Sequence, residues 1–229
     1  MKHSFIVRSM DIVISNKMRE ACPQLVLATI ICEVKNSDTS SEFWSEMEAE
    51  IQRIKSVCAL EEINKRPEIA ATRKVYKILG KDPNRYRPSA EALCRRILRE
   101  IPIYKVSTLV DVINLVSIRS GFSIGGFDLE KIEGEEIRLV VGTTDDEFEA
   151  IGRGPLNVEG LPLYKDKTGG IGTPTSDNER TKISADTTRP LMIINGYSGR
   201  SGLQDAVDFS IELLGKYGKL ANVKVNFIE

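Results

Sequence analysis

The stretch from Lys81 to Asp128 predicts two consecutive helices of opposite character, one basic and one nearly apolar. The first begins at Pro88, because proline is tolerated in a first helical turn, where its missing N–H would be unpaired anyway. The second begins at Thr108, with Asp111 three residues on in a capping-box pattern. Its apolar residues recur at i, i+3, i+4 and i+7, so one face must be buried. The remaining chain is expected to be organised around this stretch of two helices.

Asn114 interrupts the apolar helix. Asn is a poor helix former with four hydrogen-bonding sites, and it is costly to bury unless a partner or a ligand meets them. After the helix, Gly125 and Gly126 predict a turn in which the backbone can approach a ligand without side-chain obstruction. One interpretation is a polar pocket wall. The other is an Asn bonded to a neighbouring loop carbonyl, with a glycine pair that merely turns the chain.

The composition is that of an ordinary soluble globular protein. Of 229 residues, 41% are hydrophobic and 28% charged, and the formal net charge is −1. There is no global positive field for nucleic acid, so any RNA binding must come from a local patch. The first fifteen residues alternate apolar and polar types without a long apolar run, so we expect neither a signal peptide nor a membrane span.

Cysteine and histidine usage argues against metal and imidazole chemistry. The four cysteines lie far apart with no CxxC pair, which fits reduced thiols in the cytoplasm. His3 is the only histidine, which argues against a Ser-His-Asp site, a Cys-His site and a histidine metal site. We therefore expect no metal and no cofactor. If the protein catalyses hydrolysis, something other than imidazole must position the water.

Elsewhere the chain predicts strands toward both ends and helices in the middle. Apolar runs predict strands over 5–15, 24–34, 136–142, 161–164, 189–195 and 223–228, and periodicity predicts helices over 16–22, 39–58, 67–79 and 203–217. Residues 166–180 predict a glycine-rich loop or a broken hairpin. With no repeat and no low-complexity linker, we expect a single α+β domain over residues 1–229, in which two interleaved lobes share one mixed β-sheet with flanking helices.

The densest positive region of the sequence combines five arginines on and before the basic helix with neighbouring cations. The arginines are Arg85, Arg87, Arg95, Arg96 and Arg99, and the neighbours are Arg73, Lys74, Lys77 and Lys105. One interpretation is a patch that contacts RNA phosphates, because arginine forks and lysine charges exchange for counterions. The other is a solvated face with internal pairs to Glu91 and Glu100.

The glycine-rich segment 196–202 (GYSGRSG) precedes the predicted helix 203–217. It lacks the Lys-Ser/Thr pair of a phosphate-binding P-loop. Two interpretations stay open: an anion site at the helix N-terminus near Arg200, or a plain strand-to-helix turn.

Four motifs together resemble a known family: DPNRYRPSAEAL, DVINLVSIRSG, GGFDLEKIEG and TSDNERTKISADTT. Their order and spacing are similar to the tRNA-editing domain of the bacterial phenylalanyl-tRNA synthetase beta chain, the B-three/B-four (B3/4) domain, in a free-standing form. The motif matches run from about Arg73 to Asn195. The resemblance implies an α+β editing-domain architecture and a site between two lobes. That site binds the aminoacyl end of a mischarged tRNA and holds the hydrolytic water mostly with backbone groups and tRNA hydroxyls.

The resemblance also assigns pocket residues. The family's pocket Asn falls on Asn114, and the family's pocket His falls on Gly125, beside Gly126, so the imidazole is missing. The glycine strip that lines the family's pocket matches residues 169–172, with Gly170 among them. The glutamate that reads the tyrosine ring hydroxyl falls on Glu179, to within about one residue of register.

A carboxylate that accepts a phenol hydrogen bond is left unpaired when phenylalanine binds instead, which discriminates by orders of magnitude. Glu179 equally fits an exposed loop surface, because its neighbours are polar. Glycine at position 125 enlarges the pocket and implies an altered or lost amino-acid specificity.

The resemblance thus implies a protein that binds the acceptor end of a tRNA and hydrolyses a misacylated, tyrosyl-type ester in trans. We expect no complete synthetase, because an ATP-binding catalytic domain has no counterpart in 229 residues. Two other classes stay open. One is a non-catalytic RNA- or tRNA-binding module. The other is a small amino-acid-binding protein that never meets RNA, favoured by the near-zero net charge. The amino acid, the tRNA, the activity of a pocket without histidine and a homo-oligomeric state also stay open.

Overall fold

The computed structural model describes residues 10–229, so His3 and the first half of the strand expected over 5–15 lie outside the described residues. The α-helices are α1 (Asn16–Ala21), α2 (Ser41–Val57), α3 (Pro67–Ile78), α4 (Ser89–Leu98), α5 (Thr108–Ser120) and α6 (Leu203–Tyr217). The strands are β1 (Asp11–Ile14), β2 (Val26–Glu33), β3 (Ile124–Asp128), β4 (Glu136–Val141), β5 (Glu149–Ala150), β6 (Gly154–Pro155), β7 (Pro162–Lys165), β8 (Gly170–Gly172), β9 (Pro190–Gly196) and β10 (Ala221–Ile228). Each helix lies in a segment for which the sequence predicts one.

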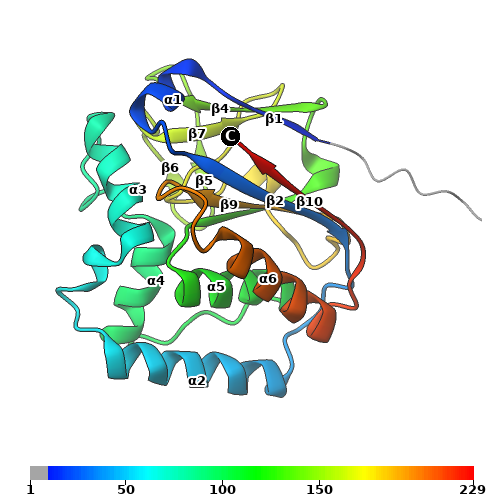
Figure 1. The fold of residues 1–229 in the computed structure, drawn as a ribbon. Helices are drawn as coiled ribbons and strands as arrows, with labels where there is room; N and C mark the ends of the chain where they lie inside the picture. The colour runs from blue at the N-terminus through cyan, green and yellow to red at the C-terminus, as the bar shows by residue number, and fades with distance from the viewer. Residues whose placement is uncertain (1–9) are drawn as a thin grey trace, which may run out of the picture.

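The described strands form two four-stranded sheets and a small hairpin (Figure 1). One sheet has the order β1-β4-β7-β8, with β1 parallel to β4 and the other pairs antiparallel. The second sheet, β10-β2-β9-β3, is antiparallel throughout, and β5 pairs with β6. The α+β class with flanking helices is confirmed. The single shared sheet is wrong, because the first and last described strands belong to different sheets.

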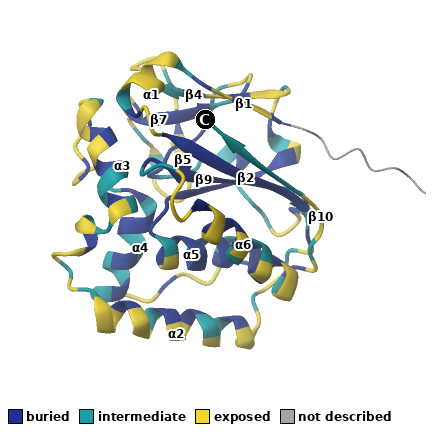
Figure 2. Ribbon diagram, in the orientation of Figure 1, coloured by how far each residue is buried: buried dark blue, intermediate teal, exposed yellow. Residues whose placement is uncertain are grey.

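The sheet β10-β2-β9-β3 is the middle layer of the molecule (Figure 1). Alternate residues of β2 enter opposite cores: Ala28 and Ile30 pack with α2, α5 and α6, whereas Leu27 and Ile31 pack toward the other sheet. A strand covered on both faces must be apolar throughout, which accounts for the unbroken apolar run of β2. Figure 2 shows the same pattern, with buried residues along β2 and β9 and exposed residues on the outer side of α2.

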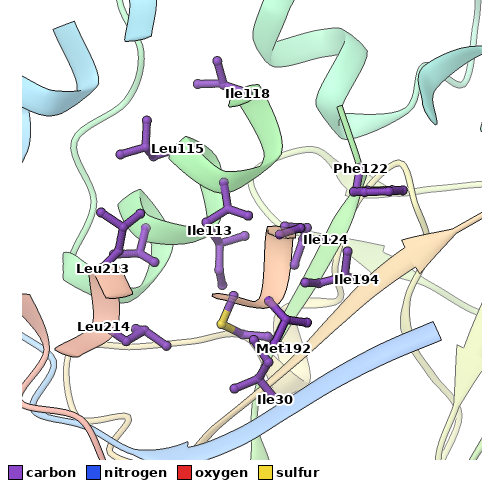
Figure 3. Packing of buried hydrophobic residues seen from close by; sticks show 14 of the residues in the cluster. Ile30, Ile113, Leu115, Ile118, Phe122, Ile124, Met192, Ile194, Leu213 and Leu214 are labelled. Carbon is purple, nitrogen blue, oxygen red and sulfur yellow. The ribbon is translucent and has the colours of Figure 1, made fainter. Parts of the chain in front are cut away.

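Helix α5 is the element around which the helical layer packs. Its Ile113, Leu115 and Ile118 belong to the core cluster that also holds Met192 and Ile194 of β9, as seen in Figure 3. The N-cap is Ser107, one residue earlier than expected, and the Asp111 carboxylate accepts a hydrogen bond from the N–H of Val106 at 3.1 Å. The helix ends at Gly121, whose φ of 86° suits glycine.

Residues 124–128 form strand β3, not the turn expected from the glycine pair. Gly125 and Gly126 lie opposite Ile193 and Met192 of β9. Both glycines are required by close packing. A Cβ on Gly126 would lie 2.4 Å from Cδ1 of Ile113, and a Cβ on Gly125 would lie 2.7 Å from Cζ of Phe127. The two residues therefore face opposite sides of the strand, with Gly126 toward α5 and Gly125 toward the other sheet.

Candidate functional site

A cavity of about 410 Å³ lies between α4 and α5 on one side and β3 with residues 176–183 on the other. We call it the apolar cavity. Its helical wall includes Leu93 and Ile113, its floor includes Ile124 and Gly126, and its opposite wall includes Ile183. Glycine at position 126 makes room for both isoleucine side chains, because an added Cβ would lie 3.0 Å from Cδ1 of Ile183. Such a mostly apolar space with a few polar groups is typical of a small-ligand site.

Asn114 lies where the apolar cavity meets a second hollow of about 310 Å³. Ser89, Leu93 and Asn114 line both spaces, so the two adjoin. Among the described residues the Asn114 amide has no hydrogen-bond partner, so the bond to a neighbouring loop carbonyl that the sequence left open is not formed. Its amide is therefore available to a ligand that spans the two spaces.

The second hollow, here called the arginine hollow, is lined by cations from two parts of the fold. The set is Arg87, Arg95, Arg96, Arg99 and Arg153. The first four come from α4 and its two ends, and Arg153 comes from the turn between β5 and β6. No aspartate or glutamate among the described residues lines this hollow. The hollow is therefore suited to an anion.

A buried carboxylate behind the hollow pairs with two of these cations, Arg87 and Arg95. Glu91 is fully buried and pairs with Arg73 at 2.8 Å, with Arg95 at 2.7 Å and with Arg87 at 3.6 Å. Three guanidinium groups share one carboxylate, so the cluster keeps an excess of positive charge. The internal ion pairs that the sequence analysis considered are thus formed at Glu91. One carboxylate does not neutralise the arginine cluster.

The other arginines expected to contact RNA differ in surroundings. Arg96 donates from Nε to the carbonyl of Pro102 at 2.5 Å, and its guanidinium lies 4.0 Å from the ring centroid of Tyr104. Arg99 is exposed, and its side chain has no ion pair or hydrogen bond in the described part of the chain. Arg85 is exposed beside the Tyr86 ring at 5.7 Å and does not line the hollow.

Asp177 lines the apolar cavity, and its carboxyl group is held at β3. Its Oδ2 accepts a hydrogen bond from the N–H of Gly126 at 3.1 Å, the only one that its side chain makes to residues 10–229. Its Oδ1 lies over two glycines, since a Cβ on Gly172 would approach it to 2.8 Å and one on Gly125 to 3.5 Å. Enclosure by protein raises the pKa of Asp177 to about 7, against the lowering effect of the Gly126 N–H.

A family model described as B3/4 domain matches residues 71–210, more than half of the chain. The chain belongs to the B3/4 domain family. The match confirms the resemblance that the four sequence motifs indicate. It covers α4, α5 and the segment 176–183, which together build both walls of the apolar cavity.

Among solved structures, this B3/4 domain is similar to an N-terminal fragment of the phenylalanyl-tRNA synthetase beta-subunit from Pyrococcus horikoshii. The TM-score is 0.46 and the sequence identity 14%, and the alignment covers 93% of this chain and 51% of that chain. The B3/4 domain therefore spans about half the length of that solved chain. No curated protein matches the sequence.

Three residues that the sequence assigned to the pocket of the B3/4 domain do not line the apolar cavity. Gly125 faces the ring of Phe127 on the opposite side of β3. Gly170, in β8, is buried against Phe148, 2.9 Å from where its Cβ would lie. The third, Glu179, is partly exposed at the start of a short 3-10 helix (Glu179–Thr181).

Glu179 holds together two segments beside the cavity. Its carboxylate pairs with Lys182, which lines the cavity, and accepts a hydrogen bond from the N–H of Gly152 at 3.2 Å. Both contacts lower the pKa of Glu179, with the Lys182 hydrogen bond the larger cause. The neighbouring N–H of Ile151 donates to the carbonyl of Asp177 at 3.1 Å. The β5–β6 turn of the B3/4 domain is thus fastened to residues 177–179.

Sequence reasoning missed Asp177, Arg153 and Tyr104. Asp177 lies two residues before Glu179 in the same polar run, and nothing in that run distinguishes the inward residue from the outward one. The glycine-rich segment 196–202 does not join this site. Arg200 pairs instead with Glu229 at 3.4 Å and lies over the Phe227 ring, and α6 has no side-chain cap.

Residues 10–229 of the B3/4 domain contain no group of three or more His, Cys, Asp or Glu side chains placed to hold a metal ion. Within the same residues, no helix is both long enough and apolar enough to cross a membrane.

Proposed function

We propose that this B3/4 domain binds the acceptor end of a tRNA and hydrolyses a misacylated, tyrosyl-type ester in trans. The observation that supports the proposal is that two unlike spaces lie side by side. An apolar cavity lined in part by Asp177 adjoins, at Asn114, a hollow lined by five arginines. The end of an aminoacyl-tRNA carries both an amino-acid side chain and an RNA phosphate. The side chain would lie in the apolar cavity, and the phosphate would contact the arginines of the hollow.

In this proposal Asp177, rather than Glu179, contacts the ring hydroxyl of the amino acid. Asp177 lines the cavity, whereas the Glu179 carboxylate is held by Lys182 and Gly152. A site built to hydrogen-bond a substrate hydroxyl rejects the analogue that lacks it, because its own polar group is left unpaired. A carboxyl group with a pKa of about 7 is present in both protonation states near neutrality, so it can donate to or accept from a phenol.

The ester itself would lie at the junction of the two spaces. There the Asn114 amide can donate to the ester carbonyl, and the RNA hydroxyls and backbone groups hold the attacking water. Preorganised donors aimed at a developing oxyanion account for large rate effects without a side-chain base.

Release of labelled amino acid tests the proposal. The substrate is tRNA(Phe) charged with tyrosine, and correctly charged tRNA(Phe) is the control. We expect selective tyrosine release, and in Asp177→Ala a loss of selectivity of roughly 100-fold or more. Glu179→Ala is the matched variant, and it should keep most of the selectivity. Selectivity lost in Glu179→Ala but kept in Asp177→Ala would reverse the assignment of the carboxyl group, and no release from either substrate would refute the hydrolysis.

A non-catalytic RNA-binding module is the second candidate, and the arginine hollow favours it independently of the cavity. Retained tRNA binding without any ester hydrolysis would identify this function. Stabilisation by free aromatic amino acids without RNA affinity would instead identify a small-molecule-binding protein.

A further inference from the structure

A hollow of about 580 Å³ lies along the β5–β6 hairpin, apart from the two spaces described above. Residues 146–149 line one part of it, residues 155–157 line another, and Asn178 completes the lining. None of these residues lines the apolar cavity or the arginine hollow. Its volume lies within the range of about 300–1,000 Å³ that is typical of ligand pockets. We call it the acidic hollow.

Two carboxylates of the acidic hollow have no cationic partner in the described chain. Asp146 pairs with Lys165, but the side chains of Glu147 and Glu149 make no ion pair or hydrogen bond among residues 10–229. Glu147 and Glu149 are exposed and the intervening Phe148 is buried, so the two carboxylates share one face of an extended segment. Two cations spaced two residues apart on a second extended chain would match them.

Two asparagines add amide donors to the acidic hollow. Asn178 is only 8% exposed, and its Oδ1 accepts a hydrogen bond from the N–H of Arg180 at 2.9 Å. Asn157 Oδ1 accepts from the N–H of Glu159 at 2.9 Å and from Lys81 Nζ at 3.3 Å. Both amide oxygens are thus occupied, whereas both N–H₂ groups lack a partner among residues 10–229. Because a buried donor is costly to leave unpaired, these groups call for an acceptor on the ligand.

The rest of the lining is apolar and comes from Phe148, Pro155 and Leu156. A metal ion does not match this hollow, because the carboxylates of residues 10–229 form no group placed to hold one. A polyamine would satisfy the carboxylates, but it carries only donors and would leave the two amides unpaired. A basic peptide supplies cations for the carboxylates, backbone carbonyls for the amides and aliphatic side-chain stems for the apolar surface.

We propose that the acidic hollow binds an extended basic segment of a partner protein. Two lysine or arginine side chains, two residues apart, pair with Glu147 and Glu149, and the Asn178 amide donates to a backbone carbonyl of the segment. This inference goes beyond the proposed function. Release of tyrosine from tRNA does not bear on it, because the two sites share no lining residue.

Fluorescence anisotropy with labelled peptides tests the charge pairing. The probe is the fluorescein-labelled pentapeptide GKVKG, and GEVEG is its charge-reversed counterpart. We expect GKVKG to bind at least about tenfold more tightly. The double variant Glu147→Gln with Glu149→Gln should weaken its binding by roughly 3- to 30-fold, the effect of two exposed ion pairs. Equal affinity for the two peptides would overturn the proposal.

The matched control is the double variant Asp145→Asn with Glu159→Gln. It removes the same charge from exposed positions that do not line the hollow. In about 0.15 M salt, it should change the affinity for GKVKG by less than about twofold, because separated surface charges are screened. An equal loss in both double variants would show that diffuse surface charge attracts the peptide, and it would overturn the proposal.

Asn178→Asp tests the amide donor. Aspartate keeps an oxygen that can accept the Arg180 N–H, so the start of the short 3-10 helix is retained. It replaces the N–H₂ group by an acceptor and adds a negative charge. At about pH 8 we expect GKVKG to bind roughly 2- to 10-fold more weakly, because one hydrogen bond is lost. Tighter binding would mean that charge alone holds the peptide, and the proposed contact would be wrong.

Titration calorimetry with spermine tests the competing occupant. We expect spermine to bind more weakly than GKVKG, because it has no acceptor for the two amides. If spermine binds more tightly, and the Glu147→Gln, Glu149→Gln variant weakens both ligands equally, the hollow is a polyamine site and the peptide proposal fails. Far-ultraviolet circular dichroism of each variant, compared with the wild type, confirms that the fold is kept.

Discussion

At the scale of single residues, glycines decide where the carboxyl group of Asp177 can lie. Gly172 and Gly125 leave space over β8 and β3, and the Phe127 ring and Asp177 Oδ1 occupy it. A Cβ at Gly172 would lie 2.6 Å from Cζ of Phe127. The backbone N–H of Gly126 donates a hydrogen bond to the Asp177 carboxylate. The glycines therefore let the Asp177 carboxyl group be enclosed between β3 and β8.

The raised pKa of Asp177 predicts a specific dependence of stability on pH. An unfolded aspartate has a pKa of about 3.9, whereas that of folded Asp177 is about 7. Between these values the folded state binds more protons than the unfolded state, so the free energy of unfolding falls as pH rises from about 4 to about 7. In Asp177→Asn this loss disappears. We expect the free energy of unfolding of the variant, relative to that of the wild type, to rise by about 1–3 kcal/mol from pH 5 to pH 8.

Urea unfolding at the two pH values measures this difference. Asp145→Asn, at an exposed turn position, is the control and should show no comparable gain. An Asp177→Asn variant whose stability difference from the wild type is the same at pH 5 and pH 8 would show that this carboxyl group is not protonated in the folded state.

At the scale of elements, α4 carries the arginine hollow because its first turn buries Glu91. The carboxylate joins α3, through Arg73, to α4, through Arg95. Arg73 also donates to the Pro83 carbonyl and to Asn84, and Arg95 to the Leu60 carbonyl. These bonds hold the helix and its cations in a fixed position, so the hollow is preorganised for an anion.

Removing the carboxylate charge should therefore destabilise the protein strongly. Arg73 and Arg95 have side chains only 10% and 15% exposed, so Glu91→Gln leaves two buried cations without a charged partner. We expect a loss of about 3–5 kcal/mol in the free energy of unfolding. Glu62→Gln breaks an exposed pair with Lys65 and should cost less than about 1 kcal/mol. Chemical denaturation of both variants measures the contrast, and equal small losses would contradict it.

At the scale of the whole molecule, β2 and β9 belong to both cores at once. Ile30 and Ile194 enter the helical core, while Leu27 and Ile193 enter the core toward the other sheet. Neither core can form without the middle sheet, so the two should not unfold separately. This supports our proposal that residues 1–229 form a single domain with interleaved lobes.

The proposal of one domain predicts a single cooperative unfolding transition. Trp44 is the only tryptophan, and it packs against the helical core. Buried tyrosines such as Tyr164 lie in the core between the sheets. Urea curves followed by Trp44 fluorescence and by tyrosine near-ultraviolet circular dichroism of a Trp44→Phe variant should share one shape and one value of m. Transitions with two separated midpoints in either protein would indicate independent lobes.

Much of the fold follows from local patterns. Helical periodicity, caps and apolar runs predicted each described α-helix and most strands, because these signals depend on neighbours within a few residues. The β3 strand was missed because a glycine pair is locally a turn signal, and only pairing with β9 makes it a strand. The division into two sheets was missed because it, too, depends on which strands pair, and local patterns do not specify that pairing.

The sequence by itself determined the α5 helix with Asn114 and the cluster of arginines on and before α4, since spacing along a helix fixes which residues share a face. It also determined the B3/4 family, through motifs read in order along the chain. Only the tertiary structure decided that Asp177, not Glu179, lines the cavity, and that Arg153 borders the arginine hollow. Those placements depend on how residues 150–152 bond to 177–179 and on the glycines of β3 and β8. Contacts between segments so far apart in the chain are set by packing, and local propensity carries no information about them.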